Sequence, residues 1–342
     1  MRKQFLTIFV VVFGGVWLWG CAATGREKPA TNVPIGLNVC YSSISAAQTA
    51  AIFAQKKGLY TKHGLEVNLV YIDGGSTAVT TLISGEMDIC QVGGAPVANA
   101  VVAGEDLVLV AGLFNRYAYA LLVTPNIVSP AALRGQSLAI SSPGSSSDGA
   151  LRALLPTLGL DPDRDVTLVE IGGQSERIAA MEAGVIAGTL VSVPESAKAR
   201  MFGYRELVNM LESDLPYSHN SIATSRRLIT NNREAVSRFL RATVEAIVMM
   251  KADKESTIAL LAQFLELDAT ADRAALEEAY QVFIVDGLPS LPWPTEAGLQ
   301  QHLDALATEI PGAVNVTASE MIDTSFLIEL EQTGFVTQLE SR

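Results

Sequence analysis

The feature that most constrains the fold of this chain is a regular alternation of strand-like and helical segments. Between residues 35 and 112, short runs rich in β-forming residues alternate with segments of helical periodicity, separated by turn glycines. Strands are expected at 35–41, 66–72, 88–92 and 107–112, and helices at 46–57, 76–83 and 95–103. This rhythm is typical of a parallel sheet with helices on both faces, so the sequence predicts an α/β fold.

The same alternation restarts after a proline-bounded connector at residues 125–130. A strand at 117–123 precedes this connector. Further strands are expected at 137–140, 165–170, 188–193 and 206–210, and helices at 148–158, 175–183 and 195–202. Each block would bury a core of its own, which is what two lobes require.

Two strand-like segments are expected to cross between the blocks, at residues 117–123 and 217–223. The second has no obvious partner in either block. From Asn231 the sequence is almost wholly helical, with helices expected at 231–252, 254–265, 271–283 and 295–308. We therefore predict two lobes joined by two hinge crossings and extended by a helical C-terminal segment: lobe 1 of residues 35–121 and 220–342, and lobe 2 of residues 122–219.

The N-terminal residues carry a different pattern. Arg2 and Lys3 precede an apolar run at 5–19, which is shorter than the roughly twenty residues that span a bilayer. The four residues that end at Cys21 resemble a bacterial lipobox, although Trp19 is bulkier than the usual residue at its place. We expect a lipoprotein signal peptide at 1–20, a lipid on Cys21 and a polar tether at 21–34. An uncleaved N-terminal anchor is the alternative.

Composition limits the partners and the chemistry. Without Arg2 and Lys3, 22 basic residues stand against 36 acidic ones, a net charge of −14, so no nucleic acid is expected as a partner. The three histidines are far apart and lack metal-ligand spacing, so neither a metal nor another cofactor is expected. Cys40 and Cys90 fall on neighbouring strands, where we expect free thiols because a disulfide between adjacent parallel strands would be strained.

Small residues follow the ends of the expected strands, where open α/β sheets bind their ligands. Backbone N–H groups at helix N-termini approach a ligand closely there, and the helix dipole favours an anion. The strongest local signal is the loop at 141–147, with five serines and a glycine before a helix. The candidate ligand-binding residues are Ser42, Ser43, Gly75, Ser76, Gly94, Asn115, Arg116, Ser142, Ser145, Ser146, Ser147, Gln174 and Glu195.

Ordinary structural roles are the alternative for each of these residues. Serines and glycines at helix starts also serve as caps and turns. Arg116 either pairs with an anionic ligand or is a solvated surface residue, and Glu195 either binds an amine or stabilises the first turn of its helix. For Gln174 and Arg177, capping is the simpler interpretation, and Tyr217, His219 and Asn220 either face the ligand or pack the hinge.

Several motifs together resemble a known family. The stretches at 58–70, 74–76 and 82–89, with 133–137 and 158–162 in the second block, are similar to those of solute-binding proteins of ABC importers. The nitrate/sulfonate/taurine type, or NMT1/THI5-like family, is the one that they resemble, over about residues 35–227. This resemblance implies a two-lobe type II periplasmic-binding-protein fold whose closed form docks on a permease.

The expected function is delivery of a small organic anion, such as an alkane- or aminosulfonate or nitrate, to an ABC importer. The expected protein is a monomer, anchored by its lipid at the outer face of the cell membrane. A thiamine-pyrimidine precursor or another heterocycle is the alternative ligand. An enzyme resembling the pyrimidine synthases, or a sensor domain, is the alternative function, although the cysteine-rich segment of those enzymes is missing from the sequence.

Overall fold

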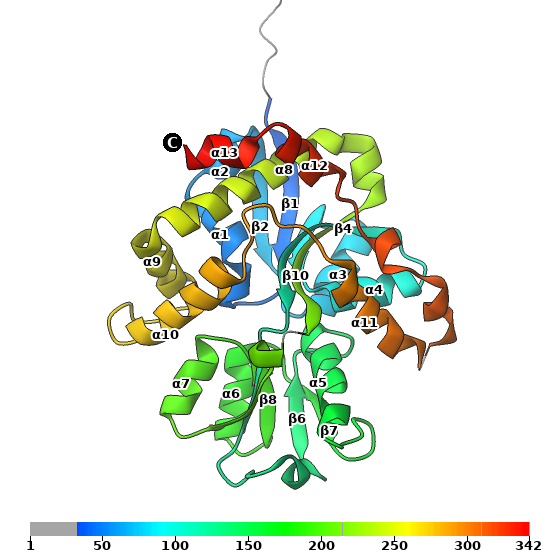
Figure 1. Ribbon diagram of the computed structural model, residues 1–342, viewed down its shortest axis with the longest axis vertical. Coiled ribbons are helices and arrows are strands. Elements are labelled where there is room, and N and C mark those ends of the chain that lie inside the picture. The colour runs from blue at the N-terminus through cyan, green and yellow to red at the C-terminus, as the bar shows by residue number, and fades with distance from the viewer. Residues whose placement is uncertain (1–32, 214, 309, 342) are drawn as a thin grey trace, which may run out of the picture. The chain divides into compact units, whose positions relative to one another are not determined.

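The strands of the described residues form two separate five-stranded sheets (Figure 1). The structure is a computed structural model and describes residues 33–213, 215–308 and 310–341. The expected signal peptide, the lipidation site Cys21 and residues 22–32 of the expected tether lie outside the described residues. Among the described residues, none of the helices combines the length and apolar character needed to cross a membrane.

Sheet 1 has the strand order β2-β1-β3-β10-β4. Its strands are β1 (Ile35–Tyr41), β2 (Leu65–Tyr71), β3 (Ile89–Val92), β4 (Leu107–Arg116) and β10 (Pro216–Ser225). Sheet 2 has the order β7-β6-β8-β5-β9. Its strands are β5 (Ala120–Val123), β6 (Ser137–Ile140), β7 (Thr167–Glu170), β8 (Gly188–Val191) and β9 (Arg205–Asn209).

The expectation of parallel sheets is wrong for one strand in each sheet. β10 is antiparallel to β3 and β4, and β5 is antiparallel to β8 and β9. β5 is the first strand of sheet 2 after the chain leaves β4 of sheet 1, and β10 is the strand by which the chain returns from β9 to sheet 1. They do not belong to strand–helix–strand units, whose crossover helices make neighbouring strands parallel.

Helices cover both faces of each sheet, as the sequence predicts. In Figure 1, sheet 2 is flanked by α5 (Ser146–Thr157), α6 (Gln174–Glu182) and α7 (Glu195–Met201). The helices around sheet 1 that precede the crossings are α1 (Thr49–Lys56), α2 (Leu59–Lys62), α3 (Gly75–Ser84) and α4 (Gly94–Val102). The later ones are α8 (Arg226–Ala252), α9 (Lys254–Phe264), α10 (Arg273–Ala279), α11 (Glu296–Ala307), α12 (Ser325–Gln332) and α13 (Phe335–Glu340).

The chain passes between the sheets at residues 117–119 and 210–215. Both segments are shorter than the crossings expected at 117–123 and 217–223, because residues 120–123 are β5 and residues 217–223 belong to β10. β10 is an inner strand of sheet 1, so the expectation that it lacks a partner is wrong. Its serines, asparagine and threonine are buried among hydrophobic neighbours, and this polar composition conceals a fully covered strand in the sequence.

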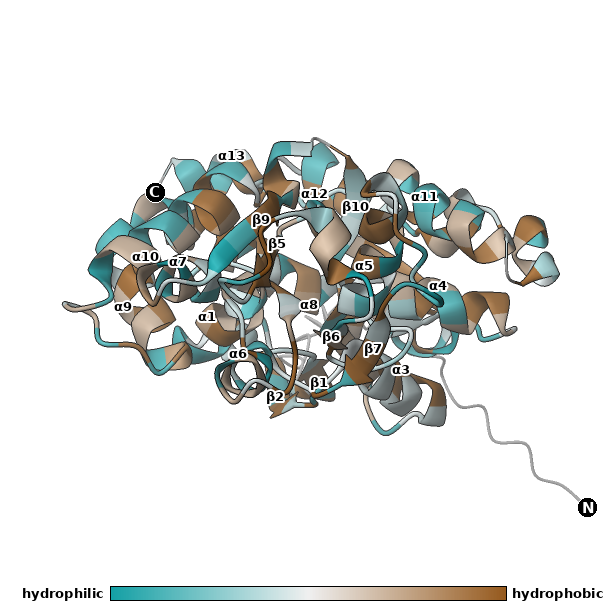
Figure 2. Cartoon of the chain, turned by 90° about the horizontal axis from the view of Figure 1, so that it is seen from below, coloured by the Kyte–Doolittle hydropathy of each residue, from teal (hydrophilic) through white to brown (hydrophobic). Residues whose placement is uncertain are grey.

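Separate hydrophobic clusters pack on the two sheets. One face of sheet 1 packs Phe53 of α1 and Phe239 of α8, and the other face packs Leu82 of α3. Sheet 2 is covered by Leu151 of α5 on one face and Met181 of α6 on the other. Figure 2 shows hydrophobic residues in strand β5 and an alternation of hydrophilic and hydrophobic segments along α11. This packing of helices on both faces holds the strands of each sheet in place, and with them the loops at the strand ends.

Cys40 and Cys90 are joined in a disulfide, so the expectation of free thiols is corrected. The two residues lie directly opposite one another in the register of β1 and β3. Their Cα atoms are 4.5 Å apart, which is inside the range that a disulfide spans. Because this register is decided by the sheet, two strand cysteines in the sequence do not reveal whether they meet.

Candidate ligand-binding site

A cavity of about 50 Å³ lies where the carboxyl ends of five parallel strands converge. Sheet 1 contributes residues that follow β1, β2 and β3, and sheet 2 contributes residues that follow β6 and β7. The cavity has room for roughly three to five water molecules at about 10–15 Å³ each. It is therefore much smaller than the roughly 300–1,000 Å³ that holds a drug-sized ligand.

Six of the thirteen candidate residues line this cavity. They follow strand ends in both sheets: Ser42, Ser43, Gly75, Ser146, Ser147 and Gln174. Gly75, Ser146 and Gln174 are the first residues of α3, α5 and α6. Three helix N-termini therefore reach the lining of one cavity, which is the arrangement that favours an anion.

The other seven candidates do not line the cavity. Ser76 donates a hydrogen bond to the Pro143 carbonyl at 2.8 Å, and Ser145 caps α5 through the Asp148 N–H. Asn115 donates to the Trp293 carbonyl at 2.9 Å, and the Arg116 guanidinium lies over the Phe114 ring. Both Asn115 and Arg116 belong to β4, which continues beyond its expected end. The remaining three are Gly94 at the start of α4, Ser142 beside Gly74, and Glu195 at the start of α7.

Arg177, which the sequence favours as a capping residue, lines the cavity from α6. Its side chain is buried, with only 3% of the residue exposed. Nε donates to the Gly173 carbonyl and one terminal nitrogen donates to the Thr189 hydroxyl, both at 3.2 Å. Burial lowers the pKa of Arg177, and neighbouring Tyr119 and Asp73 oppose this effect.

Within the described part of the chain, Arg177 forms no ion pair. A guanidinium carries five N–H donors, and only two of them have partners here. A buried cation without an ion-pair partner is costly, and the carboxylates of Asp73, Glu176 and Glu195 offset this cost only in part, so an anionic ligand would stabilise Arg177 further. The guanidinium is therefore the strongest electrostatic feature of the cavity.

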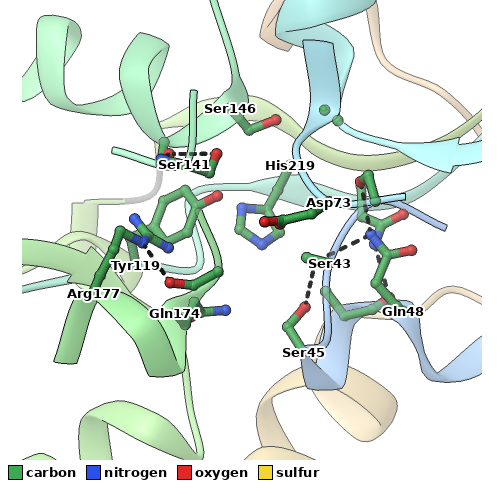
Figure 3. A pocket seen from close by; sticks show the side chains of 17 residues that line it. Ser43, Ser45, Gln48, Asp73, Tyr119, Ser141, Ser146, Gln174, Arg177 and His219 are labelled. Atoms are coloured by element: carbon green, nitrogen blue, oxygen red, sulfur yellow. Dashed lines mark hydrogen bonds between the residues drawn. The ribbon is translucent and has the colours of Figure 1, made fainter. Parts of the chain in front are cut away.

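Three residues that line the sheet 1 side of the cavity carry buried polar atoms that lack hydrogen-bond partners among the described residues: Gln48 Oε1, His219 Nδ1 and Asn220 Oδ1. All three side chains are buried. Burial lowers the pKa of His219 to about 3, so this imidazole is neutral at pH 7. Figure 3 shows Arg177, Tyr119 and Gln174 on one side of the cavity and Gln48, Ser43 and Asp73 on the other.

Close contacts join the segments on either side of the cavity. Tyr217 donates to the Ser146 carbonyl at 2.8 Å, and Asn99 donates to the Gly144 carbonyl at 3.0 Å. A Cβ atom on Gly93 would lie 1.8 Å from the Ser146 hydroxyl and 3.1 Å from the His219 carbonyl. Only glycine therefore permits the approach of α5 to the end of β3.

A larger groove of about 640 Å³ lies between α4, α5 and α11. It is lined along the sides of these helices and not at strand ends. Asp148 and Arg152, two charged residues in its lining, form an ion pair with each other at 2.9 Å. Since these charges neutralise one another, the smaller cavity is the better candidate for a charged ligand.

The chain is similar to several known binding proteins. The riboflavin-binding protein RibY of Chloroflexus aurantiacus is 29% identical over 271 residues, which cover 75% of this chain and 76% of RibY. The alkanesulfonate-binding protein SsuA from Xanthomonas axonopodis pv. citri, bound to MOPS, superimposes with a TM-score of 0.69 at 21% identity and covers 85% of this chain and 98% of SsuA. The nitrate-binding protein NrtA from Synechocystis PCC 6803 superimposes with a TM-score of 0.70 at 14% identity, and the matched region covers 88% of this chain and 89% of NrtA.

These structural similarities establish the fold, which is that of the periplasmic binding proteins. The family described as NMT1/THI5 like matches residues 46–256, which is more than half of the chain. The match covers the cavity-lining residues that follow β2, β3, β6 and β7, whereas Ser42, Ser43 and Ser45, which follow β1, precede it. The chain therefore belongs to the NMT1/THI5-like family of solute-binding proteins.

Proposed function

We propose that this protein binds a small organic anion outside the cytoplasmic membrane and delivers it to the permease of an ABC importer. The observation that carries the proposal is Arg177, a buried guanidinium that forms no ion pair among the described residues. Helix N-termini and serine hydroxyls surround the same cavity and suit a sulfonate, carboxylate or nitrate.

The structures of SsuA and NrtA support this ligand class, because their names identify an alkanesulfonate and nitrate as what those proteins bind. RibY supports a heterocycle instead, since it is a riboflavin-binding protein. A flavin is far larger than a cavity of about 50 Å³. The cavity would have to open widely to admit one, so a small anion is the better fit.

Binding and release without chemistry is the proposed activity. The cavity lining contains one histidine and no cysteine among the described residues, and the pKa of that histidine, His219, is lowered to about 3. An imidazole whose conjugate acid has so low a pKa is a weak general base at pH 7. Mass spectrometry of bound ligand, recovered after incubation, should find it unchanged. Accumulation of a product would favour the enzyme alternative.

Charge removal at Arg177 tests the anion proposal. Titration calorimetry with ethanesulfonate should show that Arg177→Gln weakens binding by at least about tenfold, while Arg177→Lys retains part of the affinity. Arg164→Gln is the matched control, because Arg164 is 83% exposed and pairs with Asp161 away from the cavity. Unchanged affinity in a folded Arg177→Gln variant would refute the proposal.

Attachment through a lipid on Cys21 remains part of the proposal. The sequence up to Cys21 supports it through the signal-like run and the lipobox resemblance. Cys21→Ala should abolish incorporation of a labelled fatty acid and release the protein from the membrane fraction. A variant that stays membrane-bound with its N-terminus intact would favour the uncleaved anchor.

A further inference from the structure

We propose, building on the anion-binding function, that binding of the ligand at Arg177 is coupled to the uptake of a proton by Glu195. Glu195 is the first residue of α7 and does not line the cavity, whereas Arg177 lines it from α6. The two helices lie side by side next to sheet 2 (Figure 1). Protonation of Glu195 would therefore regulate the affinity of a site that it does not line.

The starts of α6 and α7 are fixed to one another by buried hydrogen bonds. The Ser192 N–H donates to Gln174 Oε1 at 2.6 Å, and Gln174 Nε2 donates to the Ser192 hydroxyl at 3.1 Å. Gln174 begins α6 one turn before Arg177, and Ser192 comes directly after β8, shortly before Glu195. This link holds Glu195 and Arg177 within electrostatic reach of one another.

The Glu195 carboxyl is close to the balance between its neutral and ionised forms. Its Oε2 is buried and has no hydrogen-bond partner among the described residues, which penalises the ionised form. Its own backbone N–H and the positive charges of Lys198 and Arg177 favour the ionised form instead. Burial outweighs these attractions and raises the pKa of Glu195 to about 7. A change of charge at Arg177 therefore changes how much of Glu195 is protonated.

The other charged residues around α7 do not take the place of Arg177. Strand β5, which packs on α7, carries no charge, and Arg205 of β9 is exposed. The remaining charged residues of α7, β9 and the α10 region form ion pairs with one another: Lys198 with Asp272 at 3.5 Å, and Arg200 with Glu206 at 2.6 Å and with Glu278 at 3.0 Å. Among the described residues, Arg177 is therefore the cation near Glu195 that a ligand can engage without breaking an ion pair.

An anion bound at Arg177 changes the balance at Glu195. Its negative charge repels the Glu195 carboxylate and occupies the guanidinium that attracts this carboxylate, so the complex favours the protonated form. Well below pH 7 Glu195 is protonated in the free protein and in the complex, and the affinity does not depend on pH. As the pH rises through 7, the free protein loses the proton first, so binding has to return it and the affinity falls.

The other titratable groups of the cavity do not produce this dependence. Burial lowers the pKa of His219 to about 3 and raises that of Tyr119 to about 12, so both are neutral between about pH 5.5 and pH 9. An arginine keeps its proton throughout this range, and a sulfonate remains ionised. Two further carboxylates, those of Asp73 and Glu176, also act on the charge of Arg177, but both residues are exposed.

Titration calorimetry of the full-length protein with ethanesulfonate measures the coupling in two ways. Near pH 7, binding enthalpies in bis-Tris and in Tris, which differ in ionisation enthalpy, should reveal uptake of up to about half a proton per ligand. Neither buffer carries a sulfonate or phosphate that would compete for the site. The affinity should be at least about threefold lower at pH 9 than at pH 5.5, which corresponds to a rise of about half a unit in the pKa of Glu195 on binding.

Variants assign the proton to its residue. Glu195→Gln keeps the size of the side chain and cannot ionise, so it should bind ethanesulfonate at every pH as the wild type does at low pH, without proton uptake. Glu176→Gln is the matched control, because Glu176 also acts on Arg177 from α6 but is exposed. This control and Asp73→Asn, at the exposed rim of the cavity, should both retain the proton uptake. Circular dichroism verifies that each variant is folded.

The outcomes separate this inference from the proposed function. If ethanesulfonate does not bind at any pH, the anion-binding function fails and the inference fails with it. If it binds without proton uptake and with the same affinity at pH 5.5 and pH 9, only the coupling to Glu195 is overturned. Proton uptake that persists in Glu195→Gln, or that disappears in Glu176→Gln, would overturn it as well.

Discussion

Tyr217 stacks on Tyr117, with ring centroids 4.1 Å apart and ring planes 9° from parallel. Tyr117 lies in the first crossing between the sheets, and Tyr217 follows the second. The Tyr217 hydroxyl donates to the carbonyl of Ser146, the first residue of α5. One side chain therefore links both crossings to a helix N-terminus that lines the cavity.

Removal of the Tyr217 hydroxyl should weaken this link. Tyr217→Phe keeps the stacked ring and loses the bond to Ser146, so the free energy of unfolding should fall by about 1 kcal/mol. Urea denaturation measures this change. Tyr204→Phe, at a half-buried tyrosine before β9, serves as the control. Equal losses of unfolding free energy in the two variants would mean that the hydrogen bond from Tyr217 to Ser146 does not stabilise the fold.

Ion pairs between α7, beside sheet 2, and the α10 region, in the helical segment after β10, should hold the two sheets together around the cavity. Arg200 donates to both oxygens of Glu278 at 3.0 and 3.1 Å, and Lys198 lies 3.5 Å from Asp272. Because these side chains are partly exposed, the coupling between Arg200 and Glu278 should be only about 0.2–1 kcal/mol. A double-mutant cycle with Arg200→Gln and Glu278→Gln, read out as ligand affinity, measures it.

The pair Arg273 and Glu255, which joins α10 to α9, is the control for this cycle. It does not connect the two sheets, so its coupling should appear in unfolding but not in ligand affinity. Coupling of the same size in both affinity cycles would contradict a role of Arg200 and Glu278 in holding the sheets together around the cavity.

Glu195 should make the protein less stable as the pH rises. Burial raises the pKa of Glu195 from 4.5 to about 7. Below pH 4.5 the carboxyl is protonated in both states. Between pH 4.5 and 7 the unfolded chain releases this proton first, so folding stability is lost, in full above pH 7. We expect this loss to be about 1–3 kcal/mol.

Glu195→Gln tests this pH dependence. The variant should be more stable than the wild type at pH 8 and similar to it at pH 4, as measured by urea denaturation. The control is Glu296→Gln, at an exposed glutamate in the first turn of α11. If the stability difference between wild type and Glu195→Gln does not grow with pH, Glu195 ionises normally in the folded protein.

The disulfide between Cys40 and Cys90 should stabilise the fold by restricting the unfolded chain. It closes a loop with a sequence separation of 50. Loop entropy for this length predicts that Cys40→Ala with Cys90→Ala lowers the free energy of unfolding by up to about 4 kcal/mol. Alkylation of the unreduced, unfolded wild type provides the check on the bond itself. Labelling of both cysteines would show that they are not paired.

The local sequence was sufficient for the regular elements and for part of the site. The strands at 35–41 and 137–140 have the predicted bounds, because β-forming runs between turn signals identify a strand without knowledge of its partners. Ser42, Ser146 and Gln174 line the cavity because strand ends in an α/β fold converge wherever the strands pair. This topological rule needs only the order of the elements.

The tertiary structure alone decided which residues are buried and which residues of neighbouring strands lie opposite one another. β10 has a polar sequence, yet the folded protein covers both of its faces. Cys40 lies opposite Cys90 only because of the register of β1 and β3. Arg177 has the sequence position of an ordinary arginine near a helix start, and only the packing of the folded protein buries its side chain. The same holds for the unpartnered oxygens of Gln48 and Asn220. Burial and register are properties of contacts between distant segments, so the residue types along the chain do not determine them by themselves.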